Sequence, residues 1–127
     1  MIVGIGTDVV EVERIRRALD HPLTGMRFRD RVFTSGEVDY CAKRPRSAES
    51  FAARFAAKEA VMKALGRGFG EGIGWREIEV RREAGQPRIV LHGRARERAD
   101  ELGATRWHLS LAHTTMQAVA FVVAERM

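Results

Sequence analysis

The chain has 127 residues, which fits one domain that buries about two-thirds of the surface its unfolded chain would expose. Hydrophobic residues make up 45% and charged residues 31% of the sequence, which excludes a disordered chain, and the single Cys41 excludes an intrachain disulfide. The net charge of +5 predicts an anionic partner, and composition leaves open whether this is a nucleic acid, a phosphorylated cofactor or an acidic protein.

The N-terminal segment predicts a strand and then a helix. Residues 2–6 are apolar or glycine and indicate a short buried strand. Asp8 stands three residues before Glu11, which is the spacing of a helix capping box, so an N-cap role for Asp8 is favoured over a metal-ligand role. We expect a helix directly after it, ended by Pro22 and Gly25. Its apolar positions recur at helical spacing, at Val9, Val12, Ile15 and Leu19.

Two further helices are predicted in the middle of the chain. A short helix spans about 34–43, and the Arg44-Pro45 step breaks it. The segment 48–65 is dense in Ala, Lys, Glu, Met and Leu, and Gly66 follows it where a left-handed C-cap is expected. This segment is the strongest helix prediction in the chain.

The second half of the chain predicts mainly strands. Glycines at every second position over 66–74 predict a mobile loop, which is not a P-loop because its Lys-Ser/Thr signature is absent. The elements that follow are a hairpin of strands at 78–82 and 88–91, an amphipathic helix at 93–102, and strands at 107–111 and 116–124. The order indicates one α+β domain over residues 1–127, in which the long central helix packs on a mainly antiparallel sheet.

Four charged side chains fall within ten residues of the long helix, which is otherwise rich in alanine: Arg54, Lys58, Glu59 and Lys63. Glu59 and Lys63 have the i,i+4 spacing of an ordinary salt bridge, which is the favoured interpretation for an isolated pair. They lie about 40° apart around the helix axis, whereas Arg54 and Lys58 lie about 100° or more away. This arrangement allows the four to line two sides of an elongated phosphorylated ligand.

The C-terminal segment carries a second group of polar residues, His108-x-Ser110-x-x-His113-Thr114, on a predicted strand and just past its end. A lone histidine in such a place is usually structural. Hydroxyl and imidazole groups this close together also suit phosphate or ribose binding. Exposed backbone amides near 66–70 are a further candidate for a phosphate contact.

Together, these segments resemble the holo-acyl-carrier-protein synthases, the small group within the phosphopantetheinyl transferases. The similarity runs from Met1 to Glu125, with the motifs in family order. They are Gly4-Ile-Gly-Thr-Asp8 with Glu11 and Arg14, Arg27-Phe28 through Phe33-Thr34, Arg54-Phe-Ala-Ala-Lys58-Glu59-Ala60 with Lys63-Ala64, and His108-x-Ser110-x-x-His113-Thr114. One departure is Ala112, where the family pattern leads us to expect Ser or Thr before the histidine.

The resemblance implies a magnesium-dependent enzyme of fatty-acid biosynthesis that transfers 4′-phosphopantetheine from coenzyme A to a serine of apo acyl carrier protein and releases adenosine 3′,5′-bisphosphate. It implies that Asp8 and Glu59 hold Mg²⁺, that Lys63 neutralises the phosphates, and that Glu59 is the candidate to accept the serine proton. The cofactor-binding residues that it implies are Arg54, Lys58, Lys63, Gly66, Ser110, His113 and Thr114. The residues that it implies for carrier-protein docking are Arg14, Arg27, Phe28 and Arg31.

The resemblance also implies a homotrimer with active sites at subunit interfaces, where Arg54, His113 and Thr114 of one chain meet a cofactor held by Asp8 of another. We expect a cytoplasmic protein without a membrane segment, because no apolar run approaches about 18 residues and the N-terminus lacks a signal-peptide pattern.

Two alternatives remain at this point. A basic nucleic-acid-binding module fits the pI near 10.3, but only nine residues are aromatic and no stacking signature accompanies them, so we expect no nucleic-acid partner. Another metal-dependent phosphotransferase or phosphohydrolase would use the same carboxylates.

Overall fold

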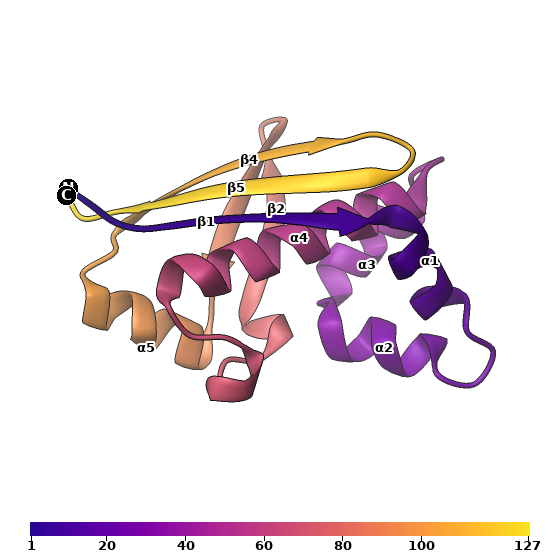
Figure 1. Ribbon diagram of the computed structural model, residues 1–127, viewed down its shortest axis with the longest axis horizontal. Coiled ribbons are helices and arrows are strands. Elements are labelled where there is room, and N and C mark those ends of the chain that lie inside the picture. Colours follow the sequence, from indigo (N-terminus) through magenta and orange to yellow (C-terminus); the bar gives the residue numbers. More distant parts are fainter.

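The computed structural model describes all 127 residues. The chain forms five helices, two 3₁₀ turns and five strands (Figure 1). In chain order they are β1 (Ile2–Glu11), α1 (Val12–Asp20), α2 (Gly25–Val32), α3 (Ser35–Ala42), α4 (Ser47–Leu65), η1 (Phe69–Glu71), η2 (Trp75–Glu77), β2 (Ile78–Glu83), β3 (Gln86–Leu91), α5 (Gly93–Leu102), β4 (Arg106–His113) and β5 (Gln117–Glu125).

The fold is a layer of helices under an antiparallel sheet. β1, β5 and β4 form a three-stranded sheet in that order, and α4 lies across one of its faces (Figure 1). Helices α1 to α3 gather at one end of α4, α5 lies near its other end, and β2 and β3 pair as a separate hairpin beside β4. The predicted α+β architecture, with a long helix packed on an antiparallel sheet, is confirmed.

Small residues let the backbone of α4 touch the sheet. A Cβ atom placed on Gly6 would lie 1.8 Å from the carbonyl oxygen of Ala60, and one on Gly4 would lie 2.2 Å from that of Ala64. Real Cβ atoms do not approach an oxygen so closely, so only glycine fits at these two positions. The contact fixes the depth and rotation of α4 on β1, and it thereby sets where the side chains of Glu59 and Lys63 emerge.

The predicted N-cap role of Asp8 is wrong. Strand β1 continues through Asp8, which pairs with Ala120, and ends only at Glu11. Helix α1 begins at Val12, and no side chain caps its N-terminus. The capping-box spacing was present in the sequence, but pairing with β5 along the whole of β1 satisfies the backbone groups that a turn at Asp8 would have left free.

The prediction that the first strand is buried is also wrong. Only Gly6 and Val10 of β1 are buried, whereas Ile5 and Val9 are exposed on the face of the sheet that α4 does not cover. Val9 therefore belongs to this outer face and not to the apolar side of α1. Val119 and Phe121 of β5 are exposed on the same outer face, so the sheet presents apolar side chains on both sides.

The remaining elements agree with the sequence in most respects. Thr34 caps α3 in a reciprocal capping box with Glu37, and α4 ends at Gly66 in the left-handed conformation (φ 72°). Helix α2 was not predicted, and the turns η1 and η2 interrupt the predicted glycine loop. The hairpin turns at Ala84 and Gly85, both with positive φ, so its second strand begins at Gln86, two residues earlier than predicted.

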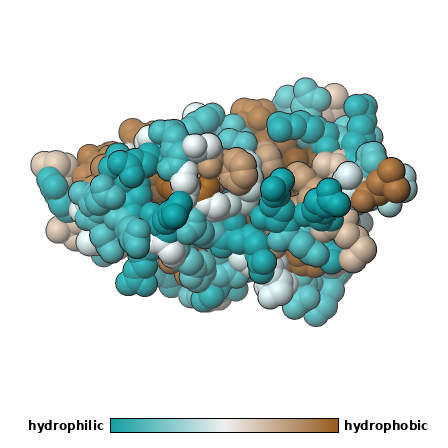
Figure 2. Space-filling model, turned by 90° about the horizontal axis from the view of Figure 1, so that it is seen from below, coloured by the Kyte–Doolittle hydropathy of each residue, from teal (hydrophilic) through white to brown (hydrophobic).

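The helical face opposite the sheet is mainly hydrophilic, with hydrophobic groups confined to small separate areas (Figure 2). None of the helices has the length and apolar character needed to cross a membrane.

Candidate functional site

The long helix and the first strand bring together three of the predicted site residues. The ammonium group of Lys63 on α4 donates hydrogen bonds to Oδ1 of Asp8 at 3.1 Å and to the carbonyl oxygen of Thr7 at 2.9 Å. Glu59 lies one turn earlier on α4. Partial burial, and then the negative charge of Asp8, raise the pKa of the Glu59 carboxyl. The two carboxylates, 51 positions apart in the chain, therefore lie close enough to repel each other.

The pair of carboxylates suits a magnesium ion that also binds a substrate. No group of three or more His, Cys, Asp or Glu side chains in the chain is placed to hold a metal. Mg²⁺, however, is commonly bound by one or two carboxylates, with substrate phosphates and water completing its shell. The repulsion between Asp8 and Glu59 is the unfavourable energy that a bound cation removes. The donor set thus fits Mg²⁺, and the metal-ligand role of these residues stays a prediction.

A hollow of about 320 Å³ opens beside Glu59 and Lys63. Its lining residues are Glu59, Met62, Lys63, Gly66, Arg67, Gly68, Phe69, Glu71 and Trp75. The ring of Phe69 stacks on that of Trp75 with centroids 5.6 Å apart, and Trp75 stacks on Phe55 at 4.9 Å. One side of the hollow is therefore charged and another is aromatic, which suits a ligand with an anionic end and a less polar arm. The sequence did not identify Phe69 and Trp75 as site residues, because they stand in or next to the glycine-rich segment. No hydrophobic periodicity there indicates which side chains line a pocket.

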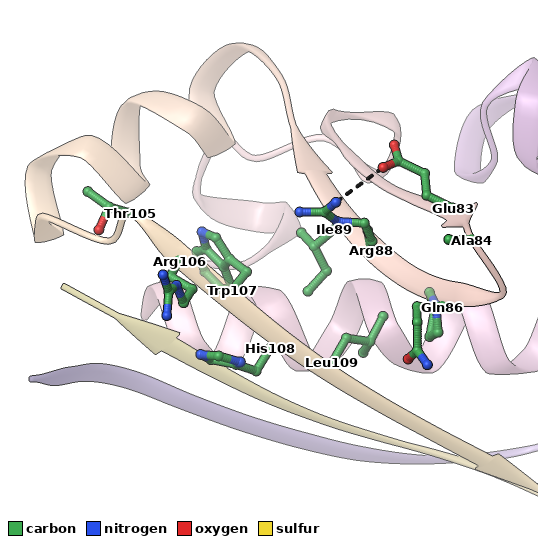
Figure 3. Close-up of a pocket in the computed structure, with 11 residues that line it drawn as sticks. Glu83, Ala84, Gln86, Arg88, Ile89, Thr105, Arg106, Trp107, His108 and Leu109 are labelled. Carbon is green, nitrogen blue, oxygen red and sulfur yellow. Dashed lines mark hydrogen bonds and ion pairs between the residues drawn. The ribbon is translucent and has the colours of Figure 1, made fainter. Parts of the chain in front are cut away.

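A larger hollow, about 660 Å³, lies elsewhere, between β3 and β4 (Figure 3). Two of its basic side chains already have acidic partners, since Arg88 pairs with Glu83 (Figure 3) and His108 contacts Glu125. Neither Glu59 nor Lys63 lines it. We place the candidate site at the smaller hollow, because only there do carboxylates, an ammonium group and an aromatic wall meet.

Lys58, predicted to bind a cofactor, points into the protein core. Its side chain is 0% exposed, and its ammonium group lies 2.8 Å from Oε1 of Glu37 and also donates to the carbonyl oxygens of Trp75 and Ile78. Burial lowers the pKa of Lys58, and the carboxylate of Glu37 opposes that effect. With three acceptors and no access to solvent, this ammonium group has no free donor for a ligand, and the structure gives Lys58 a structural role.

Arg54 belongs to a cluster of three arginines around Tyr40. The guanidinium carbon of Arg54 is 4.2 Å from the centre of the Tyr40 ring, and those of Arg44 and Arg82 are at 5.0 and 5.7 Å. Arg54 is 3% exposed, and its Nε atom is buried without a hydrogen-bond partner. No acidic group lies within 4 Å of the three. Unneutralised guanidinium groups at one place indicate an anion-binding surface, and sequence reasoning identified only one of them.

The predicted residues on β4 are not brought together. Ser110 pairs with Phe121 and points to the outer face of the sheet, whereas His113 points to the opposite face and contacts Glu49 at 2.9 Å. The hydroxyl of Thr114 accepts hydrogen bonds from the amides of Met116 and Gln117 and organises the turn before β5.

Asp8 and the β4 residues lie on opposite edges of the sheet. Asp8 is on β1 and His113 on β4, and β5 separates these two strands. Adjacent strands are about 4.8 Å apart, so the two edges are about 10 Å apart. Within one chain, the two predicted halves of the cofactor site therefore do not meet.

The predicted docking arginines differ from the neighbouring arginines because they lack acidic partners. Arg16 and Arg17 pair with Glu13, and Arg29 pairs with Asp30. Arg14, Arg27 and Arg31 have no acidic group within 4 Å.

Arg14 also connects this surface to the site. Its guanidinium carbon lies 5.5 Å from the centre of the Phe55 ring, and its charge acts on Glu59. Phe28, predicted as a surface anchor, instead packs partly buried against Phe33 and Phe55, and the exposed apolar side chains of this region are Leu23 and Met26.

Comparisons with known proteins agree on one family. A sequence model of the 4′-phosphopantetheinyl transferase superfamily matches residues 4–121. A holo-[acyl-carrier-protein] synthase of Koribacter versatilis is 48% identical over 126 residues, with 98% of this chain and 99% of the relative covered. The relative from Geobacter sulfurreducens is 42% identical and covers 99% of both chains.

Solved structures of holo-[acyl-carrier-protein] synthases resemble this chain. The holo-[acyl-carrier-protein] synthase of Neisseria meningitidis matches with a TM-score of 0.87 and 35% identity over 99% of this chain and 100% of that one. A holo-(acyl-carrier-protein) synthase of Bacillus anthracis, solved in complex with CoA (3′,5′-ADP), matches with a TM-score of 0.80 and 37% identity over 100% and 99%.

Proposed function

Since this chain belongs to the holo-[acyl-carrier-protein] synthases of the 4′-phosphopantetheinyl transferase superfamily, we propose that it transfers 4′-phosphopantetheine from coenzyme A to a serine of an apo acyl carrier protein in a Mg²⁺-dependent reaction. The product released is adenosine 3′,5′-bisphosphate, and the reaction serves cytoplasmic fatty-acid biosynthesis. The observation that carries the proposal is the meeting of Asp8, Glu59 and Lys63 beside a hollow with an aromatic wall.

Different residues of the chain perform different parts of this reaction. Asp8 and Glu59 would hold Mg²⁺, which when bound neutralises charge on the diphosphate of coenzyme A. Lys63, released from its bond to Asp8, contacts the phosphate that leaves with the nucleotide. Glu59, whose pKa is raised by burial and by Asp8, accepts the proton of the attacking serine. The rings of Phe69 and Trp75 line the path of the pantetheine arm. Most of the rate enhancement comes from positioning and charge neutralisation.

The site is shared between subunits of a homotrimer. Two observations support this assembly. First, His113 and Asp8 lie on opposite edges of the sheet, so that a cofactor held between two chains can meet the β1 edge of one chain and the β4 edge of the other. Second, the outer face of the sheet exposes Ile5, Val9, Val119 and Phe121, and an exposed apolar patch of this kind marks an interaction surface. Arg54, with its buried and unbonded Nε, then contacts the anionic part of a cofactor held by the Asp8 of a neighbour.

A charge on the outer face of the sheet tests the trimer. Phe121 is 47% exposed, and Phe121→Asp places a carboxylate in the middle of the apolar patch. We expect the unaltered protein to sediment as a trimer and the variant as a monomer with at least a 10-fold lower transfer rate, because each site loses the groups of its neighbour. Leu23→Asp, an equal change at an exposed apolar side chain on another surface, should leave the trimer intact. A monomeric parent protein at micromolar concentration contradicts the shared site.

The carrier protein docks on the unpaired arginines next to the site. Acyl carrier proteins are acidic, and Arg14, Arg27 and Arg31 are the cations of this region without acidic partners. We expect Arg14→Glu or Arg27→Glu to raise the KM for carrier protein about 10-fold at low salt and to leave the KM for coenzyme A within twofold. The matched control is Arg96→Glu on α5, an exposed arginine also without an acidic partner. Equal carrier kinetics for the docking variants and this control contradict the assignment.

The transferase activity itself is tested by mass spectrometry. The purified protein is incubated with coenzyme A, Mg²⁺ and an apo acyl carrier protein, and the carrier is weighed before and after. A gain of one phosphopantetheinyl group is expected, which is lost when EDTA replaces Mg²⁺ or when the acceptor serine of the carrier is changed to alanine. Cleavage of coenzyme A without modification of the carrier indicates a phosphohydrolase instead.

A further inference from the structure

A histidine and a glutamate meet at the end of α4 that lies away from Lys63. Nδ1 of His113, the last residue of β4, lies 2.9 Å from Oε1 of Glu49 in the first turn of α4. The Glu49 side chain is 7% exposed, whereas that of His113 is 45% exposed. The carboxylate is thus buried behind the imidazole ring, and the ring is open to solvent on its other side.

His113 is the only hydrogen-bond partner of the Glu49 carboxylate. Its second oxygen, Oε2, has only the exposed Nε of Arg46 near it, at 4.0 Å. Glu49 stands in the first turn of a 19-residue helix, where the partial positive charge of the helix N-terminus attracts a carboxylate. An ionised carboxylate only accepts hydrogen bonds, so the proton of this contact resides on Nδ1 of His113.

This contact fixes the orientation of the imidazole ring and makes Nδ1 the donor to the carboxylate. With Nδ1 bonded to Glu49, Nε2 is the free nitrogen, and no side chain or backbone group of the chain bonds to it. For Nε2 to donate to an anionic oxygen, the ring must hold a second proton, and the adjacent carboxylate balances the resulting charge. A carboxylate behind a histidine performs the same orienting task in metal sites and in catalytic triads.

We propose that Glu49 is a positioning residue that holds His113 with Nε2 turned outward, so that the ring binds an anionic group of coenzyme A. The inference deepens the proposed function and rests on it. It adds to the site a residue that contacts no substrate and acts through His113. The alternative is that Glu49 only stabilises the first turn of α4, and the two roles predict different measurements.

Steady-state kinetics with coenzyme A and apo carrier protein separate these roles. We expect Glu49→Ala to raise the KM for coenzyme A about 10-fold, with kcat and the KM for carrier protein within about twofold, because the lost interaction orients a charged hydrogen bond. Glu49→Gln keeps an acceptor for Nδ1 but loses the charge, so its KM should lie between those of Glu49→Ala and the parent. The control is Glu125→Gln, which alters the other carboxylate–histidine pair of this sheet (His108 to Glu125, 3.0 Å) and should change neither constant.

A double-mutant cycle then tests whether Glu49 acts through His113. The variant with both Glu49→Ala and His113→Ala should have the same KM for coenzyme A as His113→Ala alone. Nitrogen NMR of the histidine rings adds a direct signature: the protein has four histidines, His113→Ala assigns the signal, and the Nδ1–H resonance should be lost in Glu49→Ala.

Several outcomes overturn the inference. They are additive effects of the two changes, an unchanged KM in Glu49→Ala, a fall in melting temperature without a kinetic effect, and an unchanged KM in His113→Ala. A parent protein that leaves the carrier unmodified overturns the proposed function instead, so the two failures are distinguished by one assay of the unaltered protein.

Discussion

Asp8→Asn should lower the rate of phosphopantetheine transfer at least about 100-fold while the protein stays folded. The change removes one of the two carboxylate charges that β1 and α4 bring near each other, and a neutral amide is a poorer ligand for Mg²⁺ than a carboxylate. Transfer is measured by mass spectrometry of the carrier protein over a range of Mg²⁺ concentrations. We expect the variant to need more Mg²⁺ for half-maximal activity and to bind coenzyme A more weakly when Mg²⁺ is present.

The stability of this variant should change little. The ion pair that Asp8 forms with Lys63 is partly exposed, and pairs of that kind contribute about 1 kcal/mol or less. The loss of repulsion with Glu59 offsets part of it. A melting temperature within about 4 °C of the parent is therefore expected. Asp100→Asn on the exposed side of α5 is the matched control and should retain full activity. Normal turnover and unchanged Mg²⁺ dependence in Asp8→Asn would falsify the proposed metal site.

Lys58→Ala should destabilise the protein by about 3–5 kcal/mol, which is the usual cost of removing one partner from a buried ion pair. The change leaves the buried carboxylate of Glu37 without its counter-charge and the carbonyl oxygens of Trp75 and Ile78 without a donor. These three acceptors lie on α3, on η2 and at the start of β2, so the ammonium group ties α4 to three other segments. Urea unfolding monitored by circular dichroism measures the loss.

Lys63→Ala is the matched control for this prediction, since it makes the same substitution five residues later on the same helix. The Lys63 side chain is 54% exposed, so its removal should cost about 1 kcal/mol or less in stability. A charge about 4 Å from a phosphate interacts with it by about 4 kcal/mol at an effective dielectric of 20, so transfer by Lys63→Ala should fall steeply. The assignment is wrong if Lys58→Ala has the same urea midpoint of unfolding as the parent and Lys63→Ala has a lower one. The structural and functional roles of the two lysines would then be exchanged.

Local sequence signals predicted most helices and strands because each signal depends on near neighbours. The helix at 47–65 follows from its dense helix-forming residues and from Gly66, which adopts the left-handed conformation that ends it. Thr34 caps α3 through Glu37, three residues away. Helix α2 carries three arginines in eight residues and no apolar period, so its helical form depends on packing against α1 and not on its own pattern.

Part of the candidate site was also predicted from the sequence. The family motifs pointed to Asp8, Glu59 and Lys63, and the structure places them together. Lys58 and Lys63 look alike in the sequence, but one is buried beneath Trp75 and the other is exposed beside Asp8. A difference of five residues turns a side chain by about 140° around a helix, and the surroundings on each side come from distant segments.

The sequence by itself determined most of the helices and strands, the α+β class and the family, because short-range propensities and motif spacing depend on consecutive residues. Only the tertiary structure decided that Asp8 continues a strand, that Lys58 is buried, that three arginines surround Tyr40 and that Glu49 meets His113. Each of these depends on contacts between segments far apart in the chain. The direct contact of Gly4 and Gly6 with α4 fixes that helix on the sheet and so decides which of its side chains face the site and which face the core.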